Sequence, residues 1–259
     1  MGVLLDVARF GMGVVSIESV RPVVIVDLDD CLIPDGAAAR AAIAAVLDEF
    51  AIAATEQAVD TVLAAARREW RDHRRVTHRE VERVASWEAL WADFHELPMP
   101  SETVQALVGN DVRAWRLALD DLGSTADAAR AALAFRRLRR ALVRPFPGVE
   151  SALDSLRERH ELWLATDGCR SLQRAKIHLS GLADRFERVF VSGEVGHPKG
   201  TAEFTAAVRA ALTDGRTVCL VAGDSTTTDL LLAETGGWPF VQITDEVRFV
   251  DVPALCRCV

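Results

Sequence analysis

Lysine is nearly absent from this chain of 259 residues, although lysine and arginine together number 30. Lys176 and Lys199 are the only two, so each position is worth examining for a specific role. A net positive charge is also missing. The formal net charge is −8, which argues against nucleic acid as a general partner, because phosphate binding needs a basic face.

A membrane span and a signal peptide are missing from the sequence pattern as well. The first 20 residues are apolar, but Asp6 and Arg9 interrupt them, and no basic leader or cleavage site is evident. Internal repeats and long low-complexity tracts are not seen either. We therefore expect no membrane partner. The protein is expected to be a monomer or a homodimer.

Cysteine is scarce, and its positions do not suggest a disulfide framework. The odd, scattered set predicts reduced thiols in a cytoplasmic protein. Cys256 and Cys258 could bind a metal, but two ligands on a tail are a weak signal. The five cysteines are Cys31, Cys169, Cys219, Cys256 and Cys258.

Helical periodicity fills the chain from about residue 35 to 142. A helix is expected after Asp35 and Gly36, which are a plausible cap, and further helices from Thr55, Ser101 and Ser124. Residues 76–94 also read as a helix, with a capping box and apolar residues at helical spacing. The capping box joins Thr77 to Glu80, and the apolar face carries Val84, Trp87, Trp91 and Phe94.

Strands alternate with helices from Arg144 onward. Strands are predicted over "ELWLAT", "RVFVS", "TVCLVA" and "PFVQI", separated by helical stretches, and "VVIVD" at residues 23–27 has the same composition. Such alternation predicts an α/β fold with a Rossmann-like parallel sheet. The helical segment is then an insertion. We expect a core domain of residues 1–33 and 143–259 and an all-helical cap domain of residues 34–142.

Polar residues follow four of these strands. Parallel strands bring their carboxyl ends to one edge of a sheet, where ligands bind, so these side chains are expected to converge on one site. They are Asp27 and Asp29 after the first strand, Thr166 at the start of the turn Thr166-Asp167-Gly168, and then Lys199, Asp224 and Asp229.

The motifs "DLDDCL", "LATDG", Lys199 and "GDSTTTD" resemble, in this order, the four motifs of the haloacid dehalogenase-like (HAD) hydrolase superfamily. The resemblance covers roughly residues 22–33 and 145–243. It implies a phosphatase with a helical cap, similar to the branch containing sialic acid 9-phosphate phosphatases and pyrimidine 5′-nucleotidases. Its expected partner is a small phosphorylated metabolite, such as a sugar phosphate, a sugar-acid phosphate or a nucleotide.

The resemblance also implies a role for each residue. Asp27 would be the nucleophile that forms an aspartyl phosphate, and Asp29 the general acid and then base. Mg²⁺ would bind Asp27, Asp224 and the backbone carbonyl of Asp29, with Asp229 supporting them. Substrate phosphate would be held by Thr166, the backbone N–H of Asp167 or Gly168, and Lys199.

Departures from the family pattern are modest. Asp30 and Cys31 stand where many members have Gly-Thr, and Asp167 adds a negative charge near the expected phosphate. Asp29 favours a phosphatase over a dehalogenase, because a halide leaving group needs no proton. Residues 34–144 hold no lysine for a Schiff base, which disfavours phosphonate cleavage. A phosphomutase and a non-catalytic binding or regulatory protein remain as alternatives.

Two features near the predicted site stay open at this stage. The thiols of Cys31 and Cys169 either pack the turns or control access to the cleft. The arginines of the cap form a solvated face, or one or two of them grip an anionic group of the substrate. They are Arg67, Arg68, Arg71, Arg74, Arg75, Arg79 and Arg83.

Overall fold

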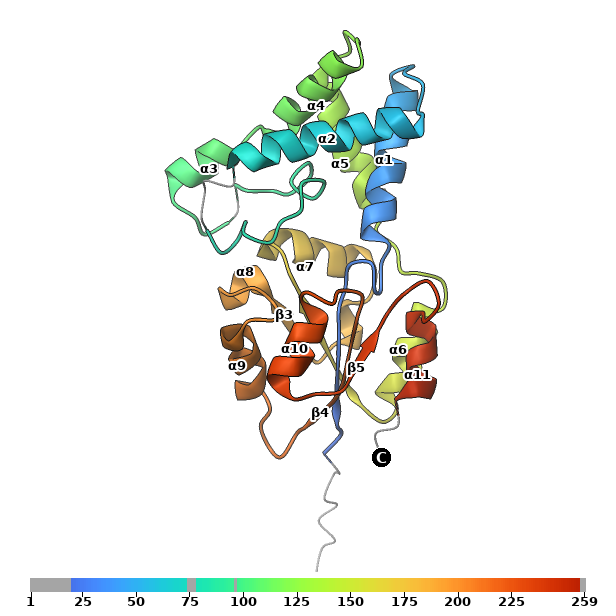
Figure 1. Ribbon diagram of the computed structural model, residues 1–259, viewed down its shortest axis with the longest axis vertical. Helices are drawn as coiled ribbons and strands as arrows, with labels where there is room; N and C mark the ends of the chain where they lie inside the picture. Colours follow the sequence, from blue (N-terminus) through green and yellow to red (C-terminus); the bar gives the residue numbers. More distant parts are fainter. Residues whose placement is uncertain (1–19, 74–77, 96, 257–259) are drawn as a thin grey trace, which may run out of the picture.

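A parallel sheet of five strands forms the centre of the lower half of the molecule (Figure 1). The computed structural model describes residues 20–73, 78–95 and 97–256, and the N-terminal 19 residues lie outside this range. The strand order is β3-β2-β1-β4-β5, and every neighbouring pair is parallel. The strands are β1 Val23–Val26, β2 Glu161–Thr166, β3 Arg188–Val191, β4 Val218–Gly223 and β5 Phe240–Gln242.

The position of β1 decides where a ligand site forms. All four of its residues are buried, since it pairs with β2 on one side and β4 on the other. The chain winds from β1 outward to β2 and β3, and then returns to add β4 and β5 on the opposite side. The order of winding therefore reverses at β1, and its carboxyl end is the expected binding crevice of such a sheet.

Helices cover both faces of the sheet. Val24 and Val26 pack in one apolar cluster with α6 and α11, whereas Val23 and Ile25 pack in the other with α9 and α10. These helices are α6 Val149–Arg157, α9 Ala202–Ala210, α10 Asp229–Gly236 and α11 Val252–Leu255. The remaining elements of this half are α7 Arg170–Leu179, α8 Ser192–Val195, η1 Ala183–Arg185 and η2 Phe249–Asp251.

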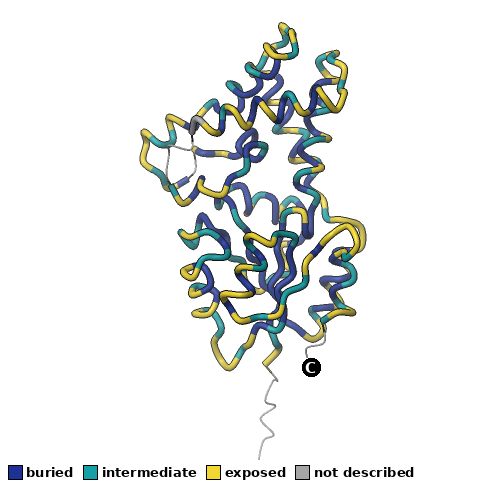
Figure 2. The backbone as a smooth tube through the Cα atoms, viewed as in Figure 1, coloured by how far each residue is buried: buried dark blue, intermediate teal, exposed yellow. Residues whose placement is uncertain are grey.

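Among the described residues between β1 and α6, five helices form the upper half of the molecule in Figure 1. Helix α2 packs against α4, α4 against α5, and α5 against α1. Figure 2 shows their inward faces buried and their outer faces exposed. They are α1 Asp35–Glu49, α2 Glu56–His73, α3 Ser101–Leu107, α4 Asn110–Asp121 and α5 Ala128–Ala141. The predicted α/β class with inserted helices is confirmed, and no helix among the described residues is long and apolar enough to cross a membrane.

Helix starts were predicted with mixed success. Thr55 caps α2 as expected, since its hydroxyl accepts from the Ala58 N–H at 3.1 Å. Helix α5 begins after Asp127, not at Ser124. Helix α4 was missed because Gly109, with φ of 77°, separates it from α3. Asp35 is no cap: it lies inside the first turn of α1, and its side chain is buried.

The predicted helix over residues 76–94 is wrong for its described part. Residues 78–95 form turns and loops, although Val84, Trp91 and Phe94 are buried as the pattern required. Tertiary contacts replace the helical ladder here. The Glu88 carboxylate accepts from the Ala85 N–H at 2.7 Å, and Glu80 accepts from the Arg170 N–H at 3.0 Å. Thr77 of the predicted capping box lies outside the described residues.

Candidate active site

Asp27, Lys199 and Asp229 form a buried charged group at the carboxyl end of the sheet. Asp27 directly follows β1, and its N–H donates to the Ala222 carbonyl at 2.9 Å. The Lys199 ammonium donates to Oδ1 of Asp27 and lies 2.7 Å from Oδ1 of Asp229. Burial opposes the charge of Lys199, but Asp229 and Asp27 outweigh it and hold its pKa well above the usual value. The lysine is therefore a permanent cation among the carboxylates.

A third carboxylate, Asp224, joins this group from the end of β4. One oxygen each of Asp27, Asp224 and Asp229 lies within 4.8 Å of the other two. Burial and the neighbouring Asp229 raise the pKa of Asp224 to about 6, while Lys199 opposes the rise. Burial likewise raises the pKa of Asp27 well above its ordinary range, against the opposing effect of Lys199. One lysine thus compensates the crowded carboxylates only in part, which is the setting of a divalent cation site.

Close packing fixes the position of Asp229. A Cβ on Gly223 would lie 2.2 Å from the carboxyl carbon of Asp229, so only glycine fits at the end of β4. The same carboxylate accepts from the Ser225 N–H at 3.0 Å. Asp229 is therefore held by its backbone surroundings as well as by Lys199.

Asp29 lies beside this group and is held by two residues of α7. Lys176 Nζ donates to its Oδ1 at 2.8 Å, and Gln173 Nε2 donates to its Oδ2 at 2.8 Å. The Asp29 side chain remains one-quarter exposed (25%), whereas both partners are fully buried. Burial raises the pKa of Asp29, Lys176 opposes the rise and Asp35 adds to it. The carboxyl group is therefore oriented and reachable.

Lys176 also reaches into the inserted helices. Its ammonium lies 2.8 Å from Asp35 of α1 and 2.5 Å from Glu88 of the 78–95 segment. Arg139 of α5 binds the same carboxylate of Asp35, which also accepts from the Trp87 indole N–H at 2.8 Å. One buried cluster thus joins Asp29 to three separate parts of the inserted segment.

The turn Thr166-Asp167-Gly168 ends β2 at the same edge. Thr166 Oγ1 accepts from Gln173 Nε2 at 2.8 Å, and the Gly168 N–H donates to Ser192 Oγ at 2.9 Å. The Asp167 carboxylate accepts from the backbone N–H of Lys199 at 2.8 Å. The extra negative charge of Asp167 therefore fixes the loop that carries Lys199.

The two thiols next to the motifs are packing residues in this structure. Cys31 and Cys169 are both buried, and Cys31 Sγ lies 3.9 Å from the Ala222 carbonyl. Burial raises the pKa of Cys169 to about 12 and that of Cys31 well above its ordinary value. Thiolates are thus disfavoured at both positions, as expected for residues that pack the turns.

The described cap arginines lie on the surface. Arg68, for example, pairs with Asp121 at 3.0 Å, and both side chains are 45% exposed. This supports the solvated-face interpretation for the described ones, which are Arg67, Arg68, Arg71, Arg79 and Arg83. Arg74 and Arg75 lie outside the described residues.

The sequence predicted the carboxylates and Lys199 but missed the residues that hold Asp29. Gln173 and Lys176 were assigned only to a helix, and Asp35 and Glu88 only to the cap. One signal was present, because Lys176 is one of two lysines in the chain. What the sequence could not show is that a residue on α7 meets the loop after β1.

Comparison with known proteins gives one family. The family model of haloacid dehalogenase-like hydrolases matches residues 22–237. Phosphoserine phosphatase from Thermus thermophilus is 34% identical over 177 residues, which cover 66% of this chain and 68% of the relative. Pyrimidine 5′-nucleotidase YjjG from Escherichia coli is 32% identical over 88 residues, 34% of this chain and only 39% of the nucleotidase.

A solved structure shows the same fold. The hydrolase YfnB from Bacillus subtilis, bound to magnesium, superposes with a TM-score of 0.57 at 20% identity. The match covers 88% of this chain and 91% of that chain. At this level of identity the likeness concerns the fold alone.

Proposed function

Because this chain belongs to the haloacid dehalogenase-like hydrolases, we propose that it is a Mg²⁺-dependent phosphatase of a small phosphorylated metabolite. Catalysis proceeds through an aspartyl phosphate on Asp27. The observation that carries the proposal is the pairing of two differently held carboxylates. Asp27 is buried against Lys199, whereas Asp29 is partly exposed and oriented by Gln173 and Lys176.

The donor atoms fit Mg²⁺, which prefers oxygen ligands. Asp27 and Asp224 bring carboxylate oxygens within 4.8 Å of each other. The backbone carbonyl of Asp29 would complete the protein's share of the ligands. Both oxygens of Asp229 have partners, Lys199 and the Ser225 N–H, so Asp229 supports the ligands from behind. When bound, the ion would supply positive charge that offsets the charge of the substrate phosphate.

In the first step, a carboxylate oxygen of Asp27 attacks phosphorus. The bond from phosphorus to the ester oxygen breaks, and Asp29 gives its proton to the departing alkoxide. Lys199 holds Oδ1 of Asp27 and leaves Oδ2 for the attack. The Thr166 hydroxyl and the backbone N–H of Asp167 or Gly168 bind phosphate oxygens. The Gly168 N–H donates to Ser192 Oγ, so this hydrogen bond must break before the Gly168 N–H can bind phosphate.

In the second step, Asp29 acts as a base. It takes a proton from a water molecule as that water attacks phosphorus, the bond to Asp27 breaks, and inorganic phosphate leaves with both carboxyl groups restored. The raised pKa of Asp29 suits a group that must carry a proton in one half of the cycle. A halide would need no such proton, so Asp29 favours ester hydrolysis over dehalogenation.

The inserted segment selects the substrate in this proposal. Residues 34–142 form the cap, and residues 1–33 and 143–259 form the core domain. Support comes from the cluster around Lys176, where cap residues Asp35 and Glu88 meet the carboxyl group that protonates the substrate. The substrate is a sugar phosphate, a sugar-acid phosphate or a nucleotide. Five scattered cysteines suit a reducing compartment, so we place the enzyme in the cytoplasm.

Phosphate release from an aryl phosphate tests the proposal. The full chain should hydrolyse it with Mg²⁺, and chelator should stop the reaction. Asp27→Asn should abolish turnover while the thermal unfolding curve stays near that of the wild type, because the change is nearly isosteric. Appreciable activity of Asp27→Asn, once mass spectrometry has excluded deamidation, would contradict the covalent mechanism. A panel of phosphorylated metabolites then identifies the substrate, and transfer of phosphate to a second sugar position instead of water would indicate a phosphomutase.

A further inference from the structure

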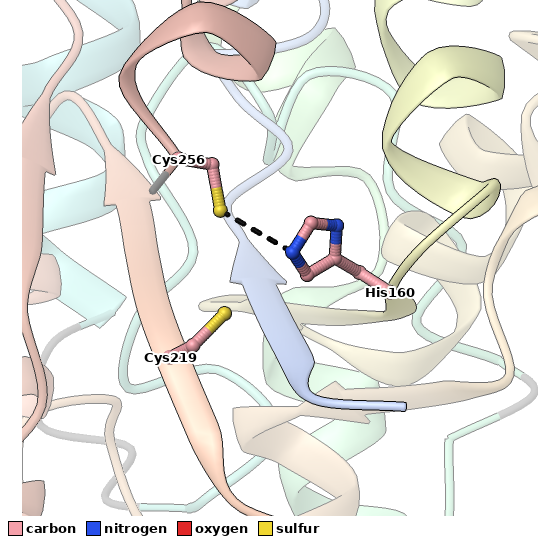
Figure 3. A group of neighbouring side chains, drawn as sticks. All are labelled: His160, Cys219 and Cys256. Atoms are coloured by element: carbon pink, nitrogen blue, oxygen red, sulfur yellow. Dashed lines mark hydrogen bonds between the residues drawn. The ribbon is translucent and has the colours of Figure 1, made fainter. Parts of the chain in front are cut away.

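A second group of metal-ligating side chains lies at the opposite edge of the sheet from the carboxylates. His160 immediately precedes β2, Cys219 is near the start of β4, and Cys256 follows α11. Figure 3 shows the three side chains converging around β1, which runs between β2 and β4. One ligand atom of each lies within 4.8 Å of the other two. His160 is buried, and both cysteines are partly buried.

An irregularity in β4 aims Cys219 at this group. In the pairing with β1, Val23 is opposite Val218 and Val24 is opposite Leu220, so Cys219 is the extra residue of a bulge. Consecutive residues of a regular strand face opposite sides, yet Cys219 and Leu220 both pack on the face covered by α6 and α11. The bulge therefore directs the sulfur to the side where His160 and Cys256 lie.

A hydrogen bond sets His160 up as a ligand. Its Nδ1 lies 3.0 Å from the Leu156 carbonyl oxygen, which can only accept, so Nδ1 carries the proton. In the neutral ring, Nε2 then has a free lone pair, and it faces Cys256 Sγ at 3.6 Å. Histidine ligands of metal ions are commonly oriented by such a bond from the other ring nitrogen to a carbonyl.

The spacing and softness of the donors match zinc. With Zn–S near 2.3 Å and Zn–N near 2.0 Å, a tetrahedral angle places sulfur and nitrogen about 3.5 Å apart. The observed 3.6 Å between His160 Nε2 and Cys256 Sγ agrees with that value. Two thiolates and an imidazole favour Zn²⁺ over Mg²⁺, which prefers oxygen ligands. In a reducing compartment, such a cysteine cluster is more often a metal site than a disulfide.

We propose that His160, Cys219 and Cys256 bind a Zn²⁺ ion, separate from the Mg²⁺ bound by the carboxylates. Binding releases the protons of both thiols to solvent, and the fourth position takes water or another donor. The ion ties the segment after α11 to the first residues of β2 and β4. Its role is structural, because the catalytic residues follow the other ends of these strands.

Cobalt is the probe for the site, because thiolate ligands give Co²⁺ a charge-transfer band in the near ultraviolet that carboxylates do not give. Full-length protein, purified with a reductant and freed of metal, is titrated with Co²⁺ and then with Zn²⁺. The band should grow to a single Co²⁺ per chain and disappear as Zn²⁺ displaces it. Asp27→Asn should show the same band, which makes the result independent of the proposed catalysis.

Variants assign the ligands. Cys256 is partly exposed, and Cys256→Ser should remove or strongly shift the band. It should also weaken Zn²⁺ binding by more than about 100-fold, because loss of a residue that only supports a ligand already costs up to about that factor. Cys219→Ser and His160→Gln should act alike, while His178→Gln, on another histidine, should bind as the wild type does. Any of three results would overturn the proposal. They are the absence of a thiolate band in the wild type, a band unchanged in both serine variants, and a Cys219–Cys256 disulfide in protein prepared with reductant.

Discussion

At the scale of the residue, the chemistry depends on how differently Asp27 and Asp29 are held. They are two positions apart, yet one is buried against Lys199 and the other is oriented by Gln173 and Lys176. Two carboxyl groups in different surroundings can take different roles in one reaction, here a nucleophile and a general acid.

The role of Asp29 is tested by varying the leaving group. Asp29→Asn should slow alkyl phosphates by on the order of 10² or more, the usual contribution of a general acid. Aryl phosphates should lose much less, since their leaving oxygens need little protonation. Rates are measured for both ester types on the same protein samples, and equal losses would mean that Asp29 is not the acid.

The support behind the site is tested at Gly223. Gly223→Ala would place a methyl group 2.2 Å from the Asp229 carboxyl carbon, so Asp229 and with it Lys199 must move. A displacement near 1 Å in an active site costs about 10² in rate, and we expect a loss of that order in kcat/KM. Gly36→Ala is the control, because its nearest neighbour would lie at 3.4 Å, an ordinary contact. Equal activity of the two variants would contradict the account.

The sequence predicted the site at this scale because polar residues of the kinds used in catalysis stand at or directly after the ends of apolar strands. Asp27 and Asp224 each follow a strand that composition alone identifies, and Thr166 is the last residue of another. Gln173 and Lys176 could not be assigned in this way, since on a helix they look like any polar surface pair. Only the folded structure shows that α7 lies next to the loop after β1, where both residues donate to Asp29.

At the scale of the element, α7 and the 78–95 segment are joined through buried charge. Lys176 is shared by Asp29, Asp35 and Glu88, and Arg139 balances Asp35. This cluster also explains the failed helix prediction. A regular helix over residues 78–95 would have competed with the contacts by which Glu88 reaches Lys176 and the Ala85 N–H. Helical spacing predicted which residues are buried but could not predict the chain's path.

Removal of the shared cation should destabilise the protein strongly. Lys176→Met leaves three carboxylates without their ammonium, and losing one partner of a buried ion pair costs about 3–5 kcal/mol. Arg174→Met on the same helix removes an ion pair with Glu194 whose arginine is 47% exposed, and should cost about 1 kcal/mol or less. Urea unfolding gives the free energy of unfolding of both variants. Similar losses of stability in the two would contradict the role of Lys176 in the buried cluster.

The pH dependence of stability tests Glu88. Burial, with Asp35 and Asp29 adding and Lys176 opposing, raises the pKa of Glu88 from 4.5 to about 7. The unfolded chain loses this proton at lower pH than the folded protein, so the contribution of Glu88 is fully present below pH 4.5 and lost as pH rises toward 7.

Glu88→Gln lacks this titration and is the matched comparison. The free energy of unfolding of the wild type minus that of the variant should fall between pH 4.5 and 7 and then level off. Denaturant unfolding at several pH values measures it. A difference that stays constant would show that folding does not shift the pKa of Glu88, and one that grows with pH would show that folding lowers it.

At the scale of the whole molecule, a parallel sheet carries two proposed sites of opposite character. Hard carboxylate oxygens gather at the carboxyl ends of the strands, and soft sulfur and nitrogen donors gather at the amino ends. Sequence motifs predicted the first site because its residues follow strands in a recognised order. They could not predict the second. A bulge in β4 directs Cys219 to it, and a hydrogen bond to the last turn of α6 orients His160.

The most direct measurement of the central claim is to trap the phosphoryl group on the enzyme. An aryl phosphate makes formation of the intermediate fast, so it should accumulate before water attacks. Acid quench within the first turnover, followed by borohydride reduction, converts an aspartyl phosphate into homoserine, which peptide mass spectrometry locates. Homoserine is expected at position 27 with Mg²⁺ and substrate, and none is expected there in chelator. Homoserine at any other aspartate, or a burst of released phenol with residue 27 unmodified, would contradict it.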